Sequence, residues 1–491
     1  MAGTTGTVGG AARTAALAAG LLGCLGASAC LHSMSEIHTG PGTAPSPGVP
    51  WSPPASAAVP APAPAPAPVI PPDLLEEASH WGLADLVDLA LRTNPDTRVA
   101  WTQARAAAAD LGARRGAYYP AIALQDNYSK IKGSAVGGKF TFRTTTQNPY
   151  VNLSYLLFDF GGRTGSIEEA RQALIAANGS HNATIQDQVL KVELAYYQYL
   201  YARALEQAEE AAVKEAQTSL DAASRRREAG VGTIADVLQA KTVLSQSRLA
   251  LETVQGQIQT IHGVLATAVG LPANTPFDVA LPESAIPAQQ AAEEVERLIA
   301  EAQALRPDLA AARAVVLQQE AHMRAVRAQG LPSLTTSFNG GRIFYPEGIQ
   351  QDTYTASLLL TIPVFNGLTY NYNLIKARAQ TEEAQARVES LRQQVVFQVW
   401  SSYYNHKTAA QKVETIKDLL ESARQSFDVA SGRYQAGVGS ILDLLTAESA
   451  LESARAQEAQ ARTEWFMTLA QLAHDTGTLW RPAASETKGT P

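Results

Sequence analysis

The same turn occurs twice in the sequence, first as Ala229-Gly230-Val231-Gly232-Thr233-Ile234-Ala235-Asp236 and again as Ala436-Gly437-Val438-Gly439-Ser440-Ile441-Leu442-Asp443. The copies lie in the two halves of the chain, and Asn94-Pro95 and Arg306-Pro307 form a second matched pair at nearly the same separation. Matching elements in the same order at one period indicate an internal duplication. The folded body is therefore expected to be one unit repeated twice.

A very long proline-free stretch precedes each copy of the turn. Thr164 to Glu228 and Leu368 to Gln435 are rich in good helix formers such as Ala, Glu, Gln and Leu. At 1.5 Å per residue each predicts roughly 100 Å of helix, far beyond the length of ordinary globular helices. Lengths of this kind are typical of coiled coils and helical barrels.

The helices that return from the turns have apolar or small residues at steps of three and four. The first such stripe runs through Thr233–Val269, and its copy runs from Leu444 to Leu472 with Glu458 as a charged interruption. Placed end to end with the helix expected from Pro307 to Gln329, the first returning helix reaches roughly 90 Å. The lengths predict a wall in which long helices alternate with stacked pairs of shorter ones.

Two β-hairpins are expected before the long helices. Their strands alternate apolar and polar residues with a period of two: Ile122–Tyr128, Val151–Leu157, Leu334–Phe338 and Ala356–Ile362, with polar loops at 130–139 and 339–351. Such alternation puts one face toward lipid and the other toward a lumen, or one face against a soluble core. Four strands cannot close a membrane barrel, because open edges in lipid leave backbone groups unsatisfied. Membrane hairpins would therefore have to share one barrel with other copies of the chain.

The N-terminus has the features of a secretory signal. Thr14–Gly23 is short and apolar and follows Arg13, which predicts a signal peptide over residues 1–23. Leu21-Leu22-Gly23-Cys24 resembles a bacterial lipobox, in which the cysteine is acylated, for example with palmitate. Cys24 is favoured over Cys30 because Leu21 fills the aliphatic position. A plain cleaved signal with incidental cysteines is the alternative.

The chain divides into five segments on composition and repeats. After the signal peptide, residues 24–72 form a Pro/Ala-rich linker, lipid-anchored if Cys24 is acylated, with the extended character of polyproline II. Residues 73–280 are the first repeat with a hairpin at 117–160, and residues 281–478 are the second with a hairpin at 330–365. Residues 479–491 form a C-terminal tail.

Composition argues against several classes of function. The net charge of −7 and the absence of a dense basic run do not suggest a nucleic-acid partner. The histidines show no metal-ligand spacing, and there is no phosphate-binding loop or nucleophile elbow. No cofactor, no metal site and no enzymatic activity are expected.

From Leu83 to Gly477 the sequence resembles the outer-membrane efflux protein family (TolC-like channels). The resemblance depends on Leu89-Ala90-Leu91 with Asn94-Pro95, on Tyr119-Pro120, on Phe158-Asp159-Phe160-Gly161-Gly162-Arg163 and on the two Ala-Gly-Val-Gly turns. The second half departs from it at Phe365-Asn366-Gly367-Leu368, which lacks the second glycine and the arginine.

The resemblance implies a mainly α-helical protein with a membrane β-barrel portion. Three copies would form a homotrimer with a 12-stranded barrel in the bacterial outer membrane and an α-helical tunnel in the periplasm. The implied function is a passive export duct for small molecules or polypeptides in a tripartite efflux or type I secretion system. The implied partners are outer-membrane lipid, a periplasmic adaptor (membrane fusion) protein and an inner-membrane pump. The alternative from another class is a lipid-anchored periplasmic coiled-coil scaffold without a pore.

The resemblance also assigns roles at the two turns. It implies a pore constriction at Asp443, with Asp236 as its equivalent and Tyr434 as part of a latch. It further implies adaptor contacts at the tips, made by Gly230, Val231, Gly232, Gly437, Val438 and Gly439. Thr446 and Gly439 stand where relatives carry a second aspartate and an arginine, so a double acidic ring and that arginine latch are not expected here. The alternative for the aspartates is a first-turn role against the helix dipole.

Overall fold

The computed structural model describes residues 81–135, 137–280, 294–346 and 348–479. The signal peptide predicted over 1–23, the candidate acylation sites Cys24 and Cys30, and the linker 24–72 lie outside the described residues, as does the C-terminal tail after residue 479. The fold described below is that of the duplicated body.

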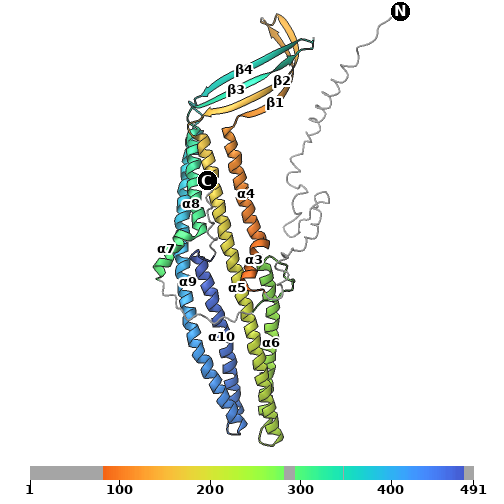
Figure 1. Cartoon of the computed structure of the whole chain (residues 1–491), viewed down its shortest axis with the longest axis vertical. Coiled ribbons are helices and arrows are strands. Elements are labelled where there is room, and N and C mark those ends of the chain that lie inside the picture. The colour runs from red at the N-terminus through yellow and green to blue at the C-terminus, as the bar shows by residue number, and fades with distance from the viewer. Residues whose placement is uncertain (1–80, 136, 281–293, 347, 480–491) are drawn as a thin grey trace, which may run out of the picture. The chain divides into compact units, whose positions relative to one another are not determined.

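Both halves contain the same kinds of element in the same order (Figure 1). The first half consists of α3 Leu83–Thr93, α4 Pro95–Arg115, the 3-10 turn η1 Gly116–Tyr118, β1 Ala121–Ala135, β2 Phe140–Phe158, α5 Gly162–Glu228 and α6 Ile234–Ala268. The second consists of α7 Val295–Leu305, α8 Pro307–Ala328, β3 Ser333–Phe344, β4 Gln350–Thr361, α9 Thr369–Gln435 and α10 Ile441–Asp475. The predicted architecture of duplicated long helices and hairpins is confirmed.

The long helices α5 and α9 have 67 residues each, and the returning helices α6 and α10 have 35 each. The ends of α5, α6 and α9 fall within two residues of the sequence prediction, because proline-free runs of helix formers are bounded by glycine turns. Most stripe positions of α6 and α10 are buried, including Leu244, Ile258 and Leu265 in the first and Leu451 in the second. Burial of this stripe stabilises helices whose intrinsic propensity alone would not fix their packing.

The helix α5 packs against elements of both halves. Its N-terminal part contacts α8 and its remainder contacts α6, while α4 and α10 also lie against it (Figure 1). Two glycines inside α5 permit the close approach of α8. A Cβ atom at Gly165 would lie 2.8 Å from the backbone nitrogen of Ala325, and one at Gly179 would lie 2.9 Å from Cβ of Ala311. The shorter helices α6 and α8 thus line successive parts of the long helix, as their lengths predicted.

A large apolar cluster joins the middle of α5 to α3 and to the C-terminal end of α6. Leu86, Leu89, Val192 and Leu265 are completely buried in it, together with Trp81 just ahead of α3. Removing such a side chain typically costs 2–5 kcal/mol. This cluster holds α3 and the C-terminal end of α6 against the middle of α5.

The turns from sheet to long helix are alike in both halves despite different residues. Phe160 and Gly161 have φ of 50° and 94°, and Gly367 and Leu368 have φ of 68° and 67°. Each half therefore uses two successive left-handed residues, only one of which is glycine. The non-glycine residue in each pair is strained by roughly 1–2 kcal/mol. Leu368 thus occupies the backbone position of Gly161, and the position of the second glycine, Gly162, is taken by Thr369 at the start of α9.

In the second half, Tyr370 stands where the first half has Arg163, and both side chains bond to a backbone carbonyl of an earlier element. In the first half, Arg163 donates from Nη1 to the carbonyl oxygens of Ala117 (3.1 Å) and Leu156 (3.0 Å). In the second half, the Tyr370 hydroxyl donates to the carbonyl of Arg327 at 3.3 Å. Arg163 thus ties the start of α5 to η1 and β2, and Tyr370 ties the start of α9 to the last turn of α8.

The strands form one antiparallel sheet in the order β1-β2-β3-β4, and β2 pairs with β3 across the two halves. They are longer than the sequence predicted, and most of the polar stretches expected as loops, 130–139 and 339–351, belong to strands. Ladder hydrogen bonds do not require apolar side chains, so the hairpins extend past the apolar pattern. In the described chain the outer edges of β1 and β4 have no partner strand.

Candidate functional site at the helix tips

Each glycine turn closes the end of a long helix with the same hydrogen bonds. Val231 N–H donates to the carbonyl of Arg226 and Val438 N–H to the carbonyl of Arg433, both at 3.0 Å. Gly230 and Gly437 have φ of 75° and 82°, the left-handed conformation that ends helices in this motif. The valines that follow, Val231 and Val438, are 66% and 71% exposed. Two apolar side chains therefore project from the turns into solvent.

The second glycine of each turn is required by close backbone approach. A Cβ atom at Gly232 would lie 3.0 Å from the backbone nitrogen of Arg227, and one at Gly439 would lie 3.0 Å from that of Tyr434. Any larger residue would have to push the end of the long helix away. Gly439, which stands where the resemblance expects an arginine, therefore has little room for a side chain in this structure.

The two aspartates at equivalent positions make different hydrogen bonds. Asp236 forms a capping box, because its carboxylate accepts from Thr233 N–H at 2.9 Å while Asp236 N–H donates to the Thr233 hydroxyl at 3.2 Å. Asp443 only donates its backbone N–H to Ser440 Oγ at 3.1 Å. Its exposed carboxylate has no hydrogen bond or ion pair within the described residues. Capping of a helix start therefore explains the carboxylate of Asp236, whereas the carboxylate of Asp443 has no such role.

The two tips share one apolar core. Ala223 of α5, Ala240 of α6, Tyr434 of α9 and Leu444 of α10 are buried together in it. Burial raises the pKa of the Tyr434 phenol; the positive charge of Arg226 opposes this and the carboxylate of Asp236 adds to it. The structure therefore brings Tyr434 and Asp236 close together, whereas Asp443 lines a groove between α9 and α10 with Arg433.

Arg226 is a tip residue that the sequence analysis missed. Its guanidinium lies over the Tyr434 ring, 4.9 Å from the centroid, and its Nη1 donates to the Tyr434 carbonyl at 2.9 Å. The contact joins the end of α5 to the end of α9. The run Arg225-Arg226-Arg227 in the last turn of α5 was a signal for it, because arginine there can bind the free carbonyls at a helix C-terminus.

Replacing Arg226 by alanine should loosen the second tip. Loss of the cation–π contact and of a charged hydrogen bond is expected to cost about 1–2 kcal/mol locally. The backbone amides of Val438 and Gly439 should then exchange with deuterium about tenfold faster, as measured by hydrogen-exchange mass spectrometry. Arg227→Ala is the matched control, since Arg227 is exposed and its side chain has no recorded contact in the described chain. Equal exchange in the two variants would show that Arg226 does not hold the tip.

In the part of the sheet nearer the helices, one face is mainly apolar and the other mainly polar. Leu153 pairs with Phe338, which pairs with Ala356, so the apolar positions of three strands align on one side. On the other side the Asn152 amide donates to Asn339 Oδ1 at 2.5 Å, and the hydroxyls of Ser337 and Ser357 lie 2.6 Å apart. The register therefore assembles the two faces that the alternating pattern predicted.

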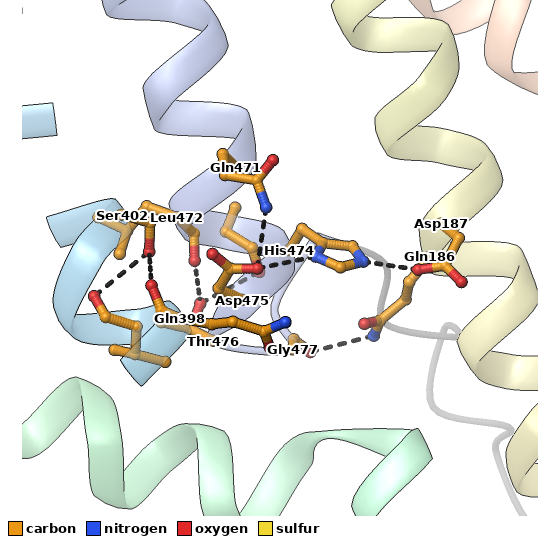
Figure 2. A network of polar contacts seen from close by, with 12 residues as sticks. Gln186, Asp187, Gln398, Ser402, Gln471, Leu472, His474, Asp475, Thr476 and Gly477 are labelled. Carbon is orange, nitrogen blue, oxygen red and sulfur yellow. Dashed lines mark hydrogen bonds and ion pairs between the residues drawn. The ribbon is translucent and has the colours of Figure 1, made fainter. Parts of the chain in front are cut away.

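A polar network ties α5 to the C-terminal end of α10 (Figure 2). His474 Nε2 lies 2.8 Å from Asp187 of α5, and Nδ1 lies 3.1 Å from the buried Asp475. Gln186 donates to the carbonyl of Gly477, and Gln471 donates to Asp475 at 2.9 Å. Burial disfavours the charged imidazole, but the two carboxylates outweigh it and raise the pKa of His474 to about 9. The histidine is therefore a cation that links two helices.

A second group of titratable residues lies between α5 and α10, nearer the tips. Glu448 is almost completely buried; its Oε2 accepts from the Ser219 hydroxyl at 2.9 Å, and its Oε1 has no partner. Burial raises its pKa to about 7, against the Ser219 hydrogen bond, and the charges of Glu215 and Glu452 add to the shift. Glu215 itself is paired with Arg455 at 2.8 and 2.9 Å.

No helix among the described residues is long and apolar enough to cross a membrane. The same part of the chain has no group of three or more His, Cys, Asp or Glu side chains that could hold a metal ion.

Comparison with known proteins identifies a family. The family model described as "Outer membrane efflux protein" matches residues 86–271 and 298–478. Protein CyaE of Bordetella pertussis is 30% identical over 82% of this chain and 85% of its own length. The probable efflux pump outer membrane protein TtgC of Pseudomonas putida is 26% identical over 76% of this chain and 78% of its own.

The fold itself is found among solved structures. The outer membrane protein VceC of Vibrio cholerae superimposes with a TM-score of 0.71 at 20% identity, over 80% of this chain and 96% of that one. Such a score at low identity shows that the arrangement of long helices and paired hairpins is shared.

Proposed function

The chain belongs to the outer membrane efflux protein family and is an outer-membrane channel component of an efflux or secretion system; we propose that three copies of it form one export duct. The four-stranded sheet supports this, because β1 and β4 each present an unpaired edge beside an exposed apolar face. In lipid such edges are satisfied only by closure into a barrel. Pairing β1 of one copy with β4 of the next closes it.

We propose further that Asp443 sets the charge at the periplasmic mouth of this duct. The observation that supports this is the free carboxylate of Asp443, which contrasts with the capping-box carboxylate of Asp236. Three such groups around one axis would concentrate negative potential and attract cations. Tyr434 and Arg226 hold the adjoining helix ends, so they position this mouth rather than line it.

The Asp443→Asn substitution tests the mouth. It should lower cation selectivity and block by trivalent cations in planar-bilayer recordings, while the helix loses only about 0.3–1 kcal/mol from its dipole interaction. Asp236→Asn is the matched control. It should change selectivity less but stability slightly more, by up to about 1 kcal/mol, because the neutral amide oxygen accepts the capping-box hydrogen bond from Thr233 N–H more weakly than the carboxylate does. Unchanged selectivity and block in both conducting variants would reduce the two aspartates to helix-start residues.

The exposed tips are the proposed adaptor surface. Gly230, Val231 and Gly232, with Gly437, Val438 and Gly439, form two small apolar projections that another helix can approach closely. A periplasmic adaptor at these tips would connect the duct to an inner-membrane pump. Acylation at Cys24 remains a prediction for the segment outside the described residues.

A further inference from the structure

On the face of the sheet that is apolar near the helices, the residue types change from row to row toward the hairpin turns. Residues directly opposite one another, and residues two apart along a strand, share a face. One row contains Leu124, Val151, Gly340 and Tyr354, and a later one contains Tyr128, Gln147, Phe344 and Gln350. Beyond that row the same face of β1 and β2 has Lys130 opposite Thr145 and Lys132 opposite Arg143. Between the first two rows the same face contains Asp126 opposite Pro149 and Arg342 opposite Asp352. The apolar band therefore ends at a charged row, which is followed by the row with Tyr128 and Phe344 and then by three basic residues.

The three basic residues, here called the basic row, lack an internal counter-charge. Lys130, Lys132 and Arg143 are all exposed, and their side chains have no recorded hydrogen bond or ion pair within the described part of the chain. Two like charges directly opposite on antiparallel strands destabilise the pairing. The acidic residues on this face are engaged elsewhere: Asp126 accepts from Gln147 at 2.8 Å and Asp352 pairs with Arg342 at 2.6 Å. The positive charge of the basic row is therefore free to interact with an anion from outside the chain.

The length of the strands places the basic row in the membrane. From Leu360 to Gln350, β4 rises about 33 Å along its axis at roughly 3.3 Å per residue. A strand tilt of about 40° reduces this to roughly 25 Å of height, which is the height of the apolar band of an outer-membrane barrel. Tyr128 and Phe344 lie at about this height, and aromatic residues are common at membrane interfaces. The basic row follows directly and lies at the level of lipid headgroups.

The headgroups concerned are those of the outer leaflet. The helices leave the sheet at the end opposite the hairpin turns and form the periplasmic part of the channel (Figure 1). The turns at 137–139 and after Phe344 therefore face the cell exterior. We propose that Lys130, Lys132 and Arg143 form a site on the outer wall of the channel that binds the phosphate groups of anionic lipid in the outer leaflet. This site depends on the membrane location of the sheet and goes beyond the export function.

The test uses purified full-length protein in zwitterionic detergent, titrated with the bis-phosphorylated glycolipid lipid A and followed by native mass spectrometry. The triple variant Lys130→Gln, Lys132→Gln, Arg143→Gln should bind lipid A on the order of a hundredfold more weakly, at about fivefold per basic residue near an anionic surface. The single variant Lys132→Gln should lose about fivefold and guards against misfolding of the triple variant. A combined Arg98→Gln, Lys376→Gln, Arg378→Gln variant removes the same charge from exposed helical positions and should bind like the parent protein.

Four results would overturn the proposal. The triple variant could bind lipid A as tightly as the parent, or the helical control could lose as much affinity as the triple variant. Inorganic phosphate could displace lipid A at equal concentration, which would indicate a site for a soluble anion. The triple variant could also fall apart into single copies in lipid-free detergent in which the parent stays assembled, which would indicate that the basic row pairs with a neighbouring copy.

Discussion

Replacing His474 by alanine should destabilise the protein by about 3 kcal/mol at pH 6, because it leaves the buried Asp475 without its cation and removes the ion pair with Asp187 that links α10 to α5. The expected measurement is the free energy of unfolding in detergent, followed by circular dichroism. His474→Gln is the control, since glutamine can donate one hydrogen bond to Asp187 and should recover part of the loss. Equal stability of the alanine variant and the parent would show that the network does not hold the helices together.

The pH dependence of the same contact provides an independent check. The pKa of His474 is about 9 in the folded chain against 6.5 for an ordinary histidine. Above pH 6.5 the unfolded chain loses this proton while the folded chain retains it. The stabilisation is therefore complete below pH 6.5 and is lost as the pH rises through 9, by about 3 kcal/mol in total. In His474→Ala this decline should be absent.

The Glu448→Gln substitution should stabilise the protein at pH 8, by up to about 3 kcal/mol. The pKa of Glu448 is about 7 in the folded chain against 4.5 for an ordinary glutamate, so ionisation is easier after unfolding. Stability should therefore fall as the pH rises from 4.5 to 7 and level off above that. Glutamine keeps the acceptor for the Ser219 hydroxyl and removes the buried charge.

The control for Glu448→Gln is Glu458→Gln on the same helix. Glu458 is only partly buried and has no recorded side-chain contact in the described residues, so its substitution should leave both stability and pH dependence nearly unchanged. Thermal unfolding of both variants between pH 4 and pH 9 separates the effects. If Glu448→Gln is less stable than the parent at pH 8, Glu448 is stabilised in its charged form, and its pKa is not raised as the structure indicates.

The long helices could be predicted from sequence because their signals are local. A proline-free run, a glycine turn and a capping residue all lie within a few residues of each helix end, as at Glu228, Gly230 and Thr233. The polar halves of the hairpins could not be predicted in this way. Lys130 and Asn339 lie in strands because the neighbouring strand satisfies their backbone groups, and no apolar pattern marks that pairing.

The polar groups inside the helical wall were missed for a related reason. The predicted stripe of α10 has its charged interruption at Glu458, but the acid that is buried within this stretch of the helix is Glu448, next to the stripe residue Ala447. Glu448 accepts a hydrogen bond from Ser219, which belongs to the other half of the chain. Arg226 and His474 likewise bond to residues of the other half, Tyr434 and Asp187. Periodicity within one helix does not reveal a neighbour that comes from the other half of the chain.

At the tips, the sequence indicated Asp236, Asp443 and Tyr434 as candidate functional residues. That only one of the two carboxylates caps a helix could be seen only in the structure.

The packing of α5 against α8 and α10 has a consequence for biosynthesis. The first half cannot bury the faces of α5 that receive these helices until the second half has also reached the periplasm. During that interval a long helix-forming segment with exposed apolar residues is available for aggregation. The two halves therefore do not fold one after the other as separate domains, and the nascent first half needs protection until its partner is complete.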